Sequence, residues 1–152
     1  MNELKHFEDF RVGDKLVTRG RTVTEADIVN FASFTGDFHP LHTDAEFAKT
    51  TPFGERIAHG MLTLSLATGL WSPEYTVQWA FVAFFGIEGI RFTAPVKIGD
   101  TLHVEFEVTE KQDRNERNGI VDFRQSVINQ RGETVSVGIF KLVIAKRQTQ
   151  SE

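Results

Sequence analysis

The chain has 152 residues, 40% hydrophobic and 25% charged, a balance that is typical of a single folded globular domain. A formal net charge of −4 at pH 7 argues against a broad nucleic-acid interface. The absence of cysteine excludes disulfides and thiolate nucleophiles and fits a reducing compartment. No apolar stretch is long enough to span a bilayer. We therefore expect one cytoplasmic domain over residues 1–152 with an ordered core at about 7–146.

The first third of the chain predicts a strand followed by a short helix. Lys15–Thr24 has strand composition, and Thr24-Glu25-Ala26-Asp27 resembles a capping box at the start of a helix. The apolar spacing predicts that this helix covers Glu25–Phe34. Gly36 then supplies a C-cap, so the residues that follow it are expected to form a loop.

The middle of the chain predicts a buried helix. Ile57–Trp71 is apolar nearly all round, with His59 as its one large polar residue, which is typical of a helix inside a core. Pro73 is expected to help to end it. The aromatic run Phe81–Phe85 could form the floor of an acyl tunnel or fill the core, and the second is the commoner fate of such residues.

The second half of the chain is rich in strand patterns. Thr101–Thr109 alternates between apolar and polar residues, as a half-buried strand does. Two further β-rich runs, 119–129 and 133–145, are joined by a hairpin turn at Asn129–Gly132. Helices followed by consecutive antiparallel strands give an α+β fold, in which the sheet curls around the buried helix. The uncovered sheet face and edges favour a homodimer.

The loop Gly36–Asp44, GDFHPLHTD, concentrates acids and histidines. Its two histidines, with an acid of the loop or with His59, have the ligand types of a zinc or iron site. Pro40 lies between the histidines and biases His39 toward extended backbone, so their spacing does not bring both rings to one side. We therefore predict no metal site. Asp44 is placed to start another short helix.

Asp37 and His42 offer a second interpretation of this loop, as an acid/base pair. Pro40 stiffens the loop, so both side chains could converge on one water. A carboxylate can accept a proton from that water and an imidazole can relay one near neutral pH, which suits the addition or removal of water. The alternative is an Asx turn formed by Asp37, with His42 satisfying a buried carbonyl.

Gly60 stands where the buried helix begins. Its N–H group would be free in an apolar setting, and together with the helix dipole it suits a developing oxyanion on a thioester carbonyl. The alternative is that glycine lets the backbone pack closely against the sheet. The neighbouring His59 is expected to be satisfied by a loop carbonyl rather than to act as a ligand.

Phe34–Asp44, read together with Ile57–Met61, closely resembles the MaoC-like hydratases, which are the (R)-specific enoyl-CoA hydratases and their dehydratase relatives. The family signature is an Asp-x-Asn-Pro-x-His loop before a buried helix that opens with His-Gly. Ile90–Val96 and Gly99–Thr101 are similar to the strand and turn after that helix. The resemblance covers the chain from about Phe7 to Lys146.

The resemblance implies a hot-dog fold, a homodimer or an assembly of dimers, and a hydro-lyase. The implied reaction is reversible hydration of a trans-2-enoyl-CoA to an (R)-3-hydroxyacyl-CoA, as in fatty acid metabolism. It implies no cofactor, because coenzyme A is part of the substrate. Asp37 and His42 match the catalytic pair, and Gly60 matches the N–H donor to the thioester oxygen.

The resemblance also implies supporting or substrate-binding positions for His59, Thr68 and His39. Thr68 falls where the family often has a serine that supports the aspartate. His39 replaces the usual asparagine and is expected to steady the loop or to tune substrate and pH range. A hot-dog acyl-CoA thioesterase and a non-catalytic acyl-thioester-binding protein are the alternative functions. The scattered lysines and arginines favour coenzyme A over acyl carrier protein as the thioester carrier.

Overall fold

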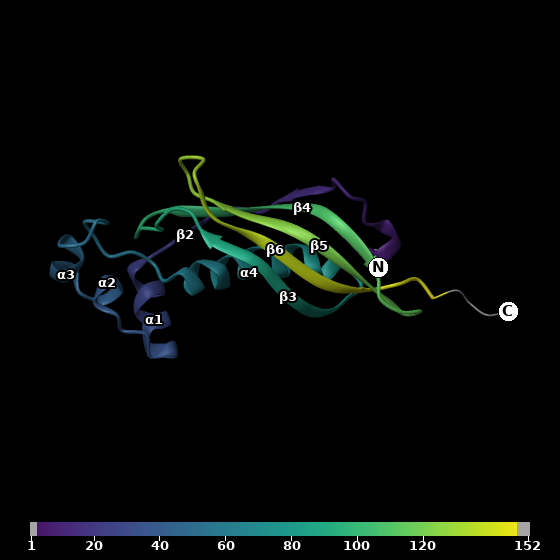
Figure 1. The fold of residues 1–152 in the computed structure, drawn as a ribbon, viewed down its shortest axis with the longest axis horizontal. Helices are drawn as coiled ribbons and strands as arrows, with labels where there is room; N and C mark the ends of the chain where they lie inside the picture. Colours follow the sequence, from purple (N-terminus) through teal and green to yellow (C-terminus); the bar gives the residue numbers. More distant parts are fainter. Residues whose placement is uncertain (1–2, 149–152) are drawn as a thin grey trace.

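The computed structural model describes residues 3–148 and consists of one antiparallel sheet with four helices (Figure 1). The elements are, in chain order, β1 (Lys15–Val17), β2 (Arg21–Thr22), α1 (Glu25–Thr35), α2 (Pro40–Thr43), α3 (Ala45–Lys49), α4 (Gly60–Tyr75), β3 (Phe81–Phe92), β4 (Thr101–Asp113), β5 (Asn118–Ile128) and β6 (Thr134–Ala145). The strand order is β1-β4-β5-β6-β3, and β2 also pairs with β4. The α+β class is confirmed.

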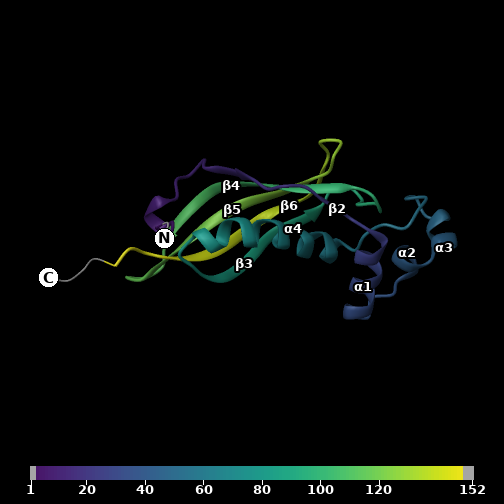
Figure 2. The same cartoon turned by 180° about the vertical axis from the view of Figure 1, so that it is seen from behind.

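The sheet curves around α4, as Figure 2 shows from the helix side. The buried residues of α4 face the apolar residues of the strands, and Trp71 meets Phe106 edge to face at 5.2 Å between ring centroids. The indole Nε1–H of Trp71 donates to Oε1 of the buried Gln125 at 2.9 Å. A buried indole needs such an acceptor, so this bond fixes how α4 lies on β5. The arrangement is the hot-dog fold that the sequence implied. Within residues 3–148 no helix is long and apolar enough to cross a membrane.

Two expected boundaries differ in the structure. The single strand expected over Lys15–Thr24 is divided into β1 and β2, because the hydroxyl of Thr18 accepts the N–H of Val104 at 2.9 Å and so interrupts the regular ladder. The long helix does not end at Pro73 but continues to Tyr75. Proline costs one backbone hydrogen bond inside a helix, and packing of this buried helix against the sheet outweighs that loss.

The aromatic run in β3 does not fill the core, so that expectation for Phe81–Phe85 is wrong, whereas the floor of an acyl tunnel stays a prediction. Phe81, Phe84 and Phe85 are 39–52% exposed. The physical reason is the position of β3 at the end of the sheet, where one edge has no partner strand. The hairpin at Asn129–Gly132 is confirmed, since it joins β5 to β6.

The three short helices gather beyond one end of the sheet, next to the start of α4 (Figure 1). α1 begins with the expected capping box, in which the Thr24 hydroxyl accepts the Asp27 N–H at 3.3 Å and the Asp27 carboxylate accepts the Thr24 N–H at 2.8 Å. Asp44 caps α3 in the same way through the N–H groups of Glu46 and Phe47. Local sequence signals therefore determine where these helices begin.

Candidate active site

The residues expected to form one loop, Gly36–Asp44, include a short helix, so Asp37 lies in the loop between α1 and α2 whereas His42 lies in α2. The Asp37 carboxylate accepts the His39 N–H at 3.3 Å, so the Asx turn considered as the alternative is present. Gly36 ends α1 in the left-handed conformation at φ 79°, which glycine adopts without strain. His39 follows in an extended conformation and Pro40 opens α2 as its first residue. This change from extended to helical backbone makes His42 the third residue of the four-residue α2.

His39 serves as the N-cap of α2. Its Nδ1 accepts the backbone N–H of Leu41 at 3.1 Å, which is the bond that an asparagine oxygen makes at an N-cap. The residue is exposed and is absent from the lining of the pocket described below. This hydrogen bond is consistent with the prediction that His39 steadies the loop in place of asparagine.

The tautomer of His42 follows from its hydrogen bond. Nδ1 lies 2.7 Å from the carbonyl oxygen of Ile57. A carbonyl can only accept, so Nδ1 carries the proton, and in the neutral ring Nε2 has the free lone pair that a base needs. Burial, followed by the nearby imidazole of His59, lowers the pKa of His42 below its usual value. The ring is therefore neutral, and able to accept a proton, at neutral pH.

Backbone pairing of Ile57–Ala58 with Val96–Lys97 holds the Ile57 carbonyl in place. Ile57 pairs with Lys97 in an antiparallel bridge, and the Ala58 N–H donates to the Val96 carbonyl at 2.8 Å. Asp100 stabilises the turn that follows Val96, because its buried carboxylate accepts the Lys97 N–H at 2.9 Å.

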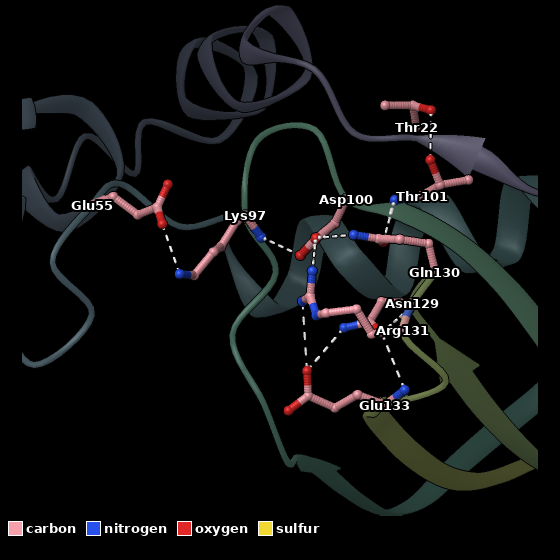
Figure 3. A network of polar contacts seen from close by, with 9 residues as sticks. All are labelled: Thr22, Glu55, Lys97, Asp100, Thr101, Asn129, Gln130, Arg131 and Glu133. Carbon is pink, nitrogen blue, oxygen red and sulfur yellow. Dashed lines mark hydrogen bonds and ion pairs between the residues drawn. The ribbon is translucent and has the colours of Figure 1, made fainter.

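Two side chains from the β5–β6 hairpin also donate hydrogen bonds to Asp100 (Figure 3). Gln130 Nε2 donates to Asp100 Oδ1 at 2.8 Å, and the Arg131 guanidinium donates to the same oxygen at 2.9 Å. Burial alone would raise the pKa of Asp100, but the bonds from Arg131, Gln130 and the Lys97 N–H outweigh it and hold that pKa below its usual value. Asp100 therefore remains charged and holds the backbone of Lys97 in place.

His59 lies behind His42. Its Nε2–H donates to the Asp37 carbonyl oxygen at 3.0 Å, which confirms that a loop carbonyl satisfies this ring. The Asp37 carboxylate is farther away, with Oδ2 at 4.0 Å from Nε2, a distance beyond a hydrogen bond. The rings of His42 and His59 are stacked, with centroids 3.8 Å apart and planes inclined by 29°.

Asp37, His42 and His59 form one cluster. One ligand-type atom of each lies within 4.8 Å of the others, a spacing that a single water can bridge. The near-parallel stacking of the two imidazoles speaks against a shared metal, because their in-plane lone pairs do not converge on one point. The Asp37 side chain is 54% exposed, so water reaches the carboxylate directly.

Gly60 and His42 line the same pocket. The pocket has a volume of about 320 Å³ and is mostly apolar, with walls from α4, the end of β3 and residues 93–96. The N–H groups of Gly60, Met61 and Leu62 have no acceptor within the described residues, and the His59 side chain does not cap the helix. Free donors and the positive end of a 16-residue helix therefore meet an apolar space in which an oxyanion could form.

The close-packing explanation for Gly60 also holds. A Cβ at this position would lie 2.7 Å from the Phe92 ring, which is closer than carbon atoms approach in proteins. A larger residue at position 60 would therefore force the Phe92 ring to move, which is a steric reason for glycine here in addition to any role of its N–H. The sequence did not single out Phe92, since only the fold brings the end of β3 to the start of α4.

Thr68 does not hydrogen-bond to Asp37, whereas Thr63, which the sequence analysis did not single out, lines the pocket. Thr68 donates its hydroxyl to the Leu64 carbonyl at 3.0 Å, and no hydrogen bond joins it to Asp37 within the described residues, so the expected support of Asp37 is not found within one chain. Thr63 is buried, lines the pocket and donates to the His59 carbonyl at 3.3 Å. Its position one turn after Gly60 is the signal that could have identified it.

Comparisons with known proteins agree with this geometry. The family model described as MaoC like domain matches residues 8–129. Protein MaoC of Klebsiella aerogenes is 41% identical over 114 residues, which are 75% of this chain and 33% of that protein, so the chain spans about a third of this relative's length. The (R)-specific enoyl-CoA hydratase of Rhodospirillum rubrum is 36% identical over 106 residues, covering 70% of this chain and 71% of the enzyme.

A solved structure is similar over almost the whole chain. The X-ray structure of a monoamine oxidase regulatory protein from Archaeoglobus fulgius matches with a TM-score of 0.92 and 46% identity, covering 96% of this chain and 97% of that one. The sequence motifs, the sheet wrapped around α4 and the family match over most of the chain agree with one another. The chain belongs to the MaoC-like domain family.

Proposed function

We propose that this protein catalyses the reversible hydration of a trans-2-enoyl-CoA to an (R)-3-hydroxyacyl-CoA. The observation that carries the proposal is the position of His42, whose Nδ1 is engaged by the Ile57 carbonyl and which lines the same apolar pocket as Gly60 at the uncapped start of α4. A base and an oxyanion donor on one pocket are what addition of water to a conjugated thioester needs. The (R)-specific hydratase among the relatives supports this reaction class.

In the proposed reaction the Asp37 carboxylate accepts a hydrogen bond from a water and orients it toward C3. His42 Nε2 accepts a proton from that water as the C3–O bond forms and the C2–C3 double bond opens. The negative charge passes to the thioester oxygen, where the Gly60 N–H stabilises it. His42 then returns the proton to C2 on the same face, so that one water has been added and the enzyme is unchanged.

Coenzyme A is the proposed carrier of the acyl chain, and no cofactor takes part in these steps. The pocket of about 320 Å³ is apolar on most sides, which suits an acyl chain. A panel of enoyl-CoA thioesters of increasing length and branching would locate the preferred substrate. The cysteine-free sequence keeps the cytoplasm as the proposed location.

A homodimer formed through β3 is the proposed assembly. β3 is an edge strand, and its apolar side chains are exposed along its whole length. An open apolar edge is a template for pairing, and a second copy could pair antiparallel and cover it. Val82→Glu should lower the molar mass in solution from dimer to monomer, whereas Val12→Glu, at an apolar residue that is 66% exposed in a turn, should not.

The main experiment follows the loss of the enoyl absorbance of crotonyl-CoA. Wild type should remove it, and Asp37→Asn and His42→Ala should lower kcat/KM by about a hundredfold to ten-thousandfold, the usual contribution of a general acid or base. A hot-dog thioesterase would instead release free thiol. Variants that matched the wild type in every assay would favour a non-catalytic acyl-binding protein, an alternative for which the Archaeoglobus relative, a monoamine oxidase regulatory protein, is a precedent.

A further inference from the structure

His59 contacts three segments at once, although none of its atoms lines the pocket. Its side chain is 3% exposed. The ring stacks on His42 of α2, lies 5.0 Å from the Phe31 ring of α1, and donates Nε2–H to the Asp37 carbonyl in the loop between those helices. His59 itself precedes α4 as its N-cap residue.

The bond to Asp37 is the shortest restraint on this part of the loop. The Asp37 N–H reaches the Thr35 hydroxyl at 3.2 Å, and its carboxylate receives the His39 N–H at 3.3 Å, whereas His59 Nε2 lies 3.0 Å from the carbonyl. The first two bonds join exposed residues two positions apart. The bond from His59 comes from a buried residue 22 positions away, so it fixes the loop relative to α4.

The other ring nitrogen of His59 has a distinct environment. Nδ1 is buried and has no hydrogen-bond partner within residues 3–148. The ring is suited to a single donated bond at Nε2, with its face free to pack.

We propose that His59 is a positioning residue that couples the two catalytic groups: its N–H fixes the main chain of Asp37, and its face fixes the ring plane of His42. The inference rests on the proposed function and assigns to His59 a part that differs from binding the substrate. Without this ring, the loop and α2 would be joined to α4 by fewer contacts, and the carboxylate and imidazole would no longer be held on the same water.

Stacking also affects the charge state of His42. The ring of His59 covers one face of the His42 imidazole at 3.8 Å, and burial is the largest cause of the lowered His42 pKa. The titratable groups that face His42 are His59 and His39, which lower its pKa, and Asp37, which raises it. Removing the stacked ring should therefore expose His42 to water and move its pKa upward.

Two substitutions separate the two contacts. His59→Phe keeps a buried aromatic ring against His42 and removes the donor to Asp37. His59→Gln keeps a donor and removes the stacked ring. Both should lower kcat for enoyl-CoA hydration by about tenfold to a hundredfold, since a small misplacement of reacting groups has effects of that size, with KM changing less.

The pH dependence distinguishes the variants from each other. In His59→Gln the acid limb of the kcat profile should move to higher pH, toward the ordinary histidine value, whereas in His59→Phe it should stay closer to wild type. Titration of the His42 ring nitrogens by ¹⁵N NMR should show the same order without any substrate. His103→Gln, a change on β4 where His103 faces Glu105 at 3.6 Å, should leave the kinetics and the His42 titration as in wild type.

The inference is overturned if both His59 variants keep wild-type kcat and an unshifted His42 titration while only their melting temperatures change, because His59 would then act in folding alone. The proposed function fails separately, if wild type hydrates no enoyl thioester. In that case the NMR titration still tests the coupling of His59 to His42, since it needs no turnover.

Discussion

The N-termini of α1 and α4 are treated in opposite ways. At α1 the Thr24 side chain and the Asp27 carboxylate close the first turn, and acidic residues face the positive end of the helix dipole. At α4 the His59 side chain donates elsewhere, the first turn carries no acid, and the leading N–H groups have no acceptor within residues 3–148. The N-terminus of α1 is capped by side chains of its own first turn, whereas the N-terminus of α4 is uncapped and lies at the pocket.

The capped start of α1 contributes to stability, whereas we propose that the uncapped start of α4 acts in catalysis. Unpaired N–H groups at a helix end are normally satisfied by side chains or water, and leaving them free beside an apolar pocket costs stability. This loss of stability is offset when a bound ligand supplies an acceptor for the free N–H groups. In the proposed reaction, the thioester oxygen that gains negative charge is such an acceptor.

Gly60→Ala should have the largest effect of the changes at these two ends. The added methyl would meet the Phe92 ring at 2.7 Å, so either the ring or the start of α4 must shift. We expect kcat/KM to fall by about a hundredfold, comparable to losing an oxyanion donor, as measured with crotonyl-CoA. Adding Phe92→Ala should restore part of the activity. If Gly60→Ala alone keeps wild-type kinetics, the close contact between position 60 and Phe92 does not affect catalysis.

Asp100→Ala tests the backbone segment at Val96–Lys97, which holds the Ile57 carbonyl in place next to the pocket. It removes the acceptor of the Lys97 N–H, Gln130 and Arg131, and we expect the free energy of unfolding to fall by about 1–3 kcal/mol, because buried groups lose their partners while Arg131 itself is half exposed. Urea unfolding measures this loss. The kcat should also fall, since Lys97 pairs with the residue whose carbonyl holds His42. Full activity with reduced stability would contradict this connection.

Thr24→Ala tests the capped N-terminus of α1. Loss of the cap should lower the free energy of unfolding by about 1 kcal/mol, measured by urea or thermal unfolding. The kcat of the folded protein should stay at the wild-type level, because Thr24 lies outside the pocket. A large loss of kcat with little loss of stability would show that the two helix ends are not separated in function as described.

The smallest expected effect is a dependence of stability on pH. His42 has a folded pKa below its ordinary value of 6.5, with burial as the main cause. Above about pH 6.5 its contribution is fully present. Below it the unfolded chain binds a proton that the folded chain resists, so stability falls until the pH passes the lowered pKa. Urea unfolding from about pH 8 to about pH 5 should show a flatter dependence in His42→Gln.

The sequence predicted features that depend on neighbouring residues. The capping box of Thr24, the end of α1 at Gly36 and the start of α3 after Asp44 all follow from side chains within a few positions, and each is confirmed. The alternation in β4 likewise follows from a pattern of period two. The family motifs added the hot-dog fold, which residue spacing alone could not specify.

The sequence could not predict contacts that depend on which distant segments meet. The stacking of His42 on His59 and the approach of Phe92 to Gly60 join residues far apart in the chain. The exposure of Phe81–Phe85 depends on the position of β3 at the sheet edge. Composition gives the same expectation for a buried and an exposed aromatic run, so only the topology distinguishes them.

The most direct test of the central claim is hydration of crotonyl-CoA in heavy water, with NMR analysis of the product. The account predicts (R)-3-hydroxybutyryl-CoA with one deuterium at C2, added on the same face as the oxygen at C3, and almost no product from Asp37→Asn or His42→Ala. Release of free coenzyme A thiol in place of this product, or equal labelling by wild type and both variants, would contradict it.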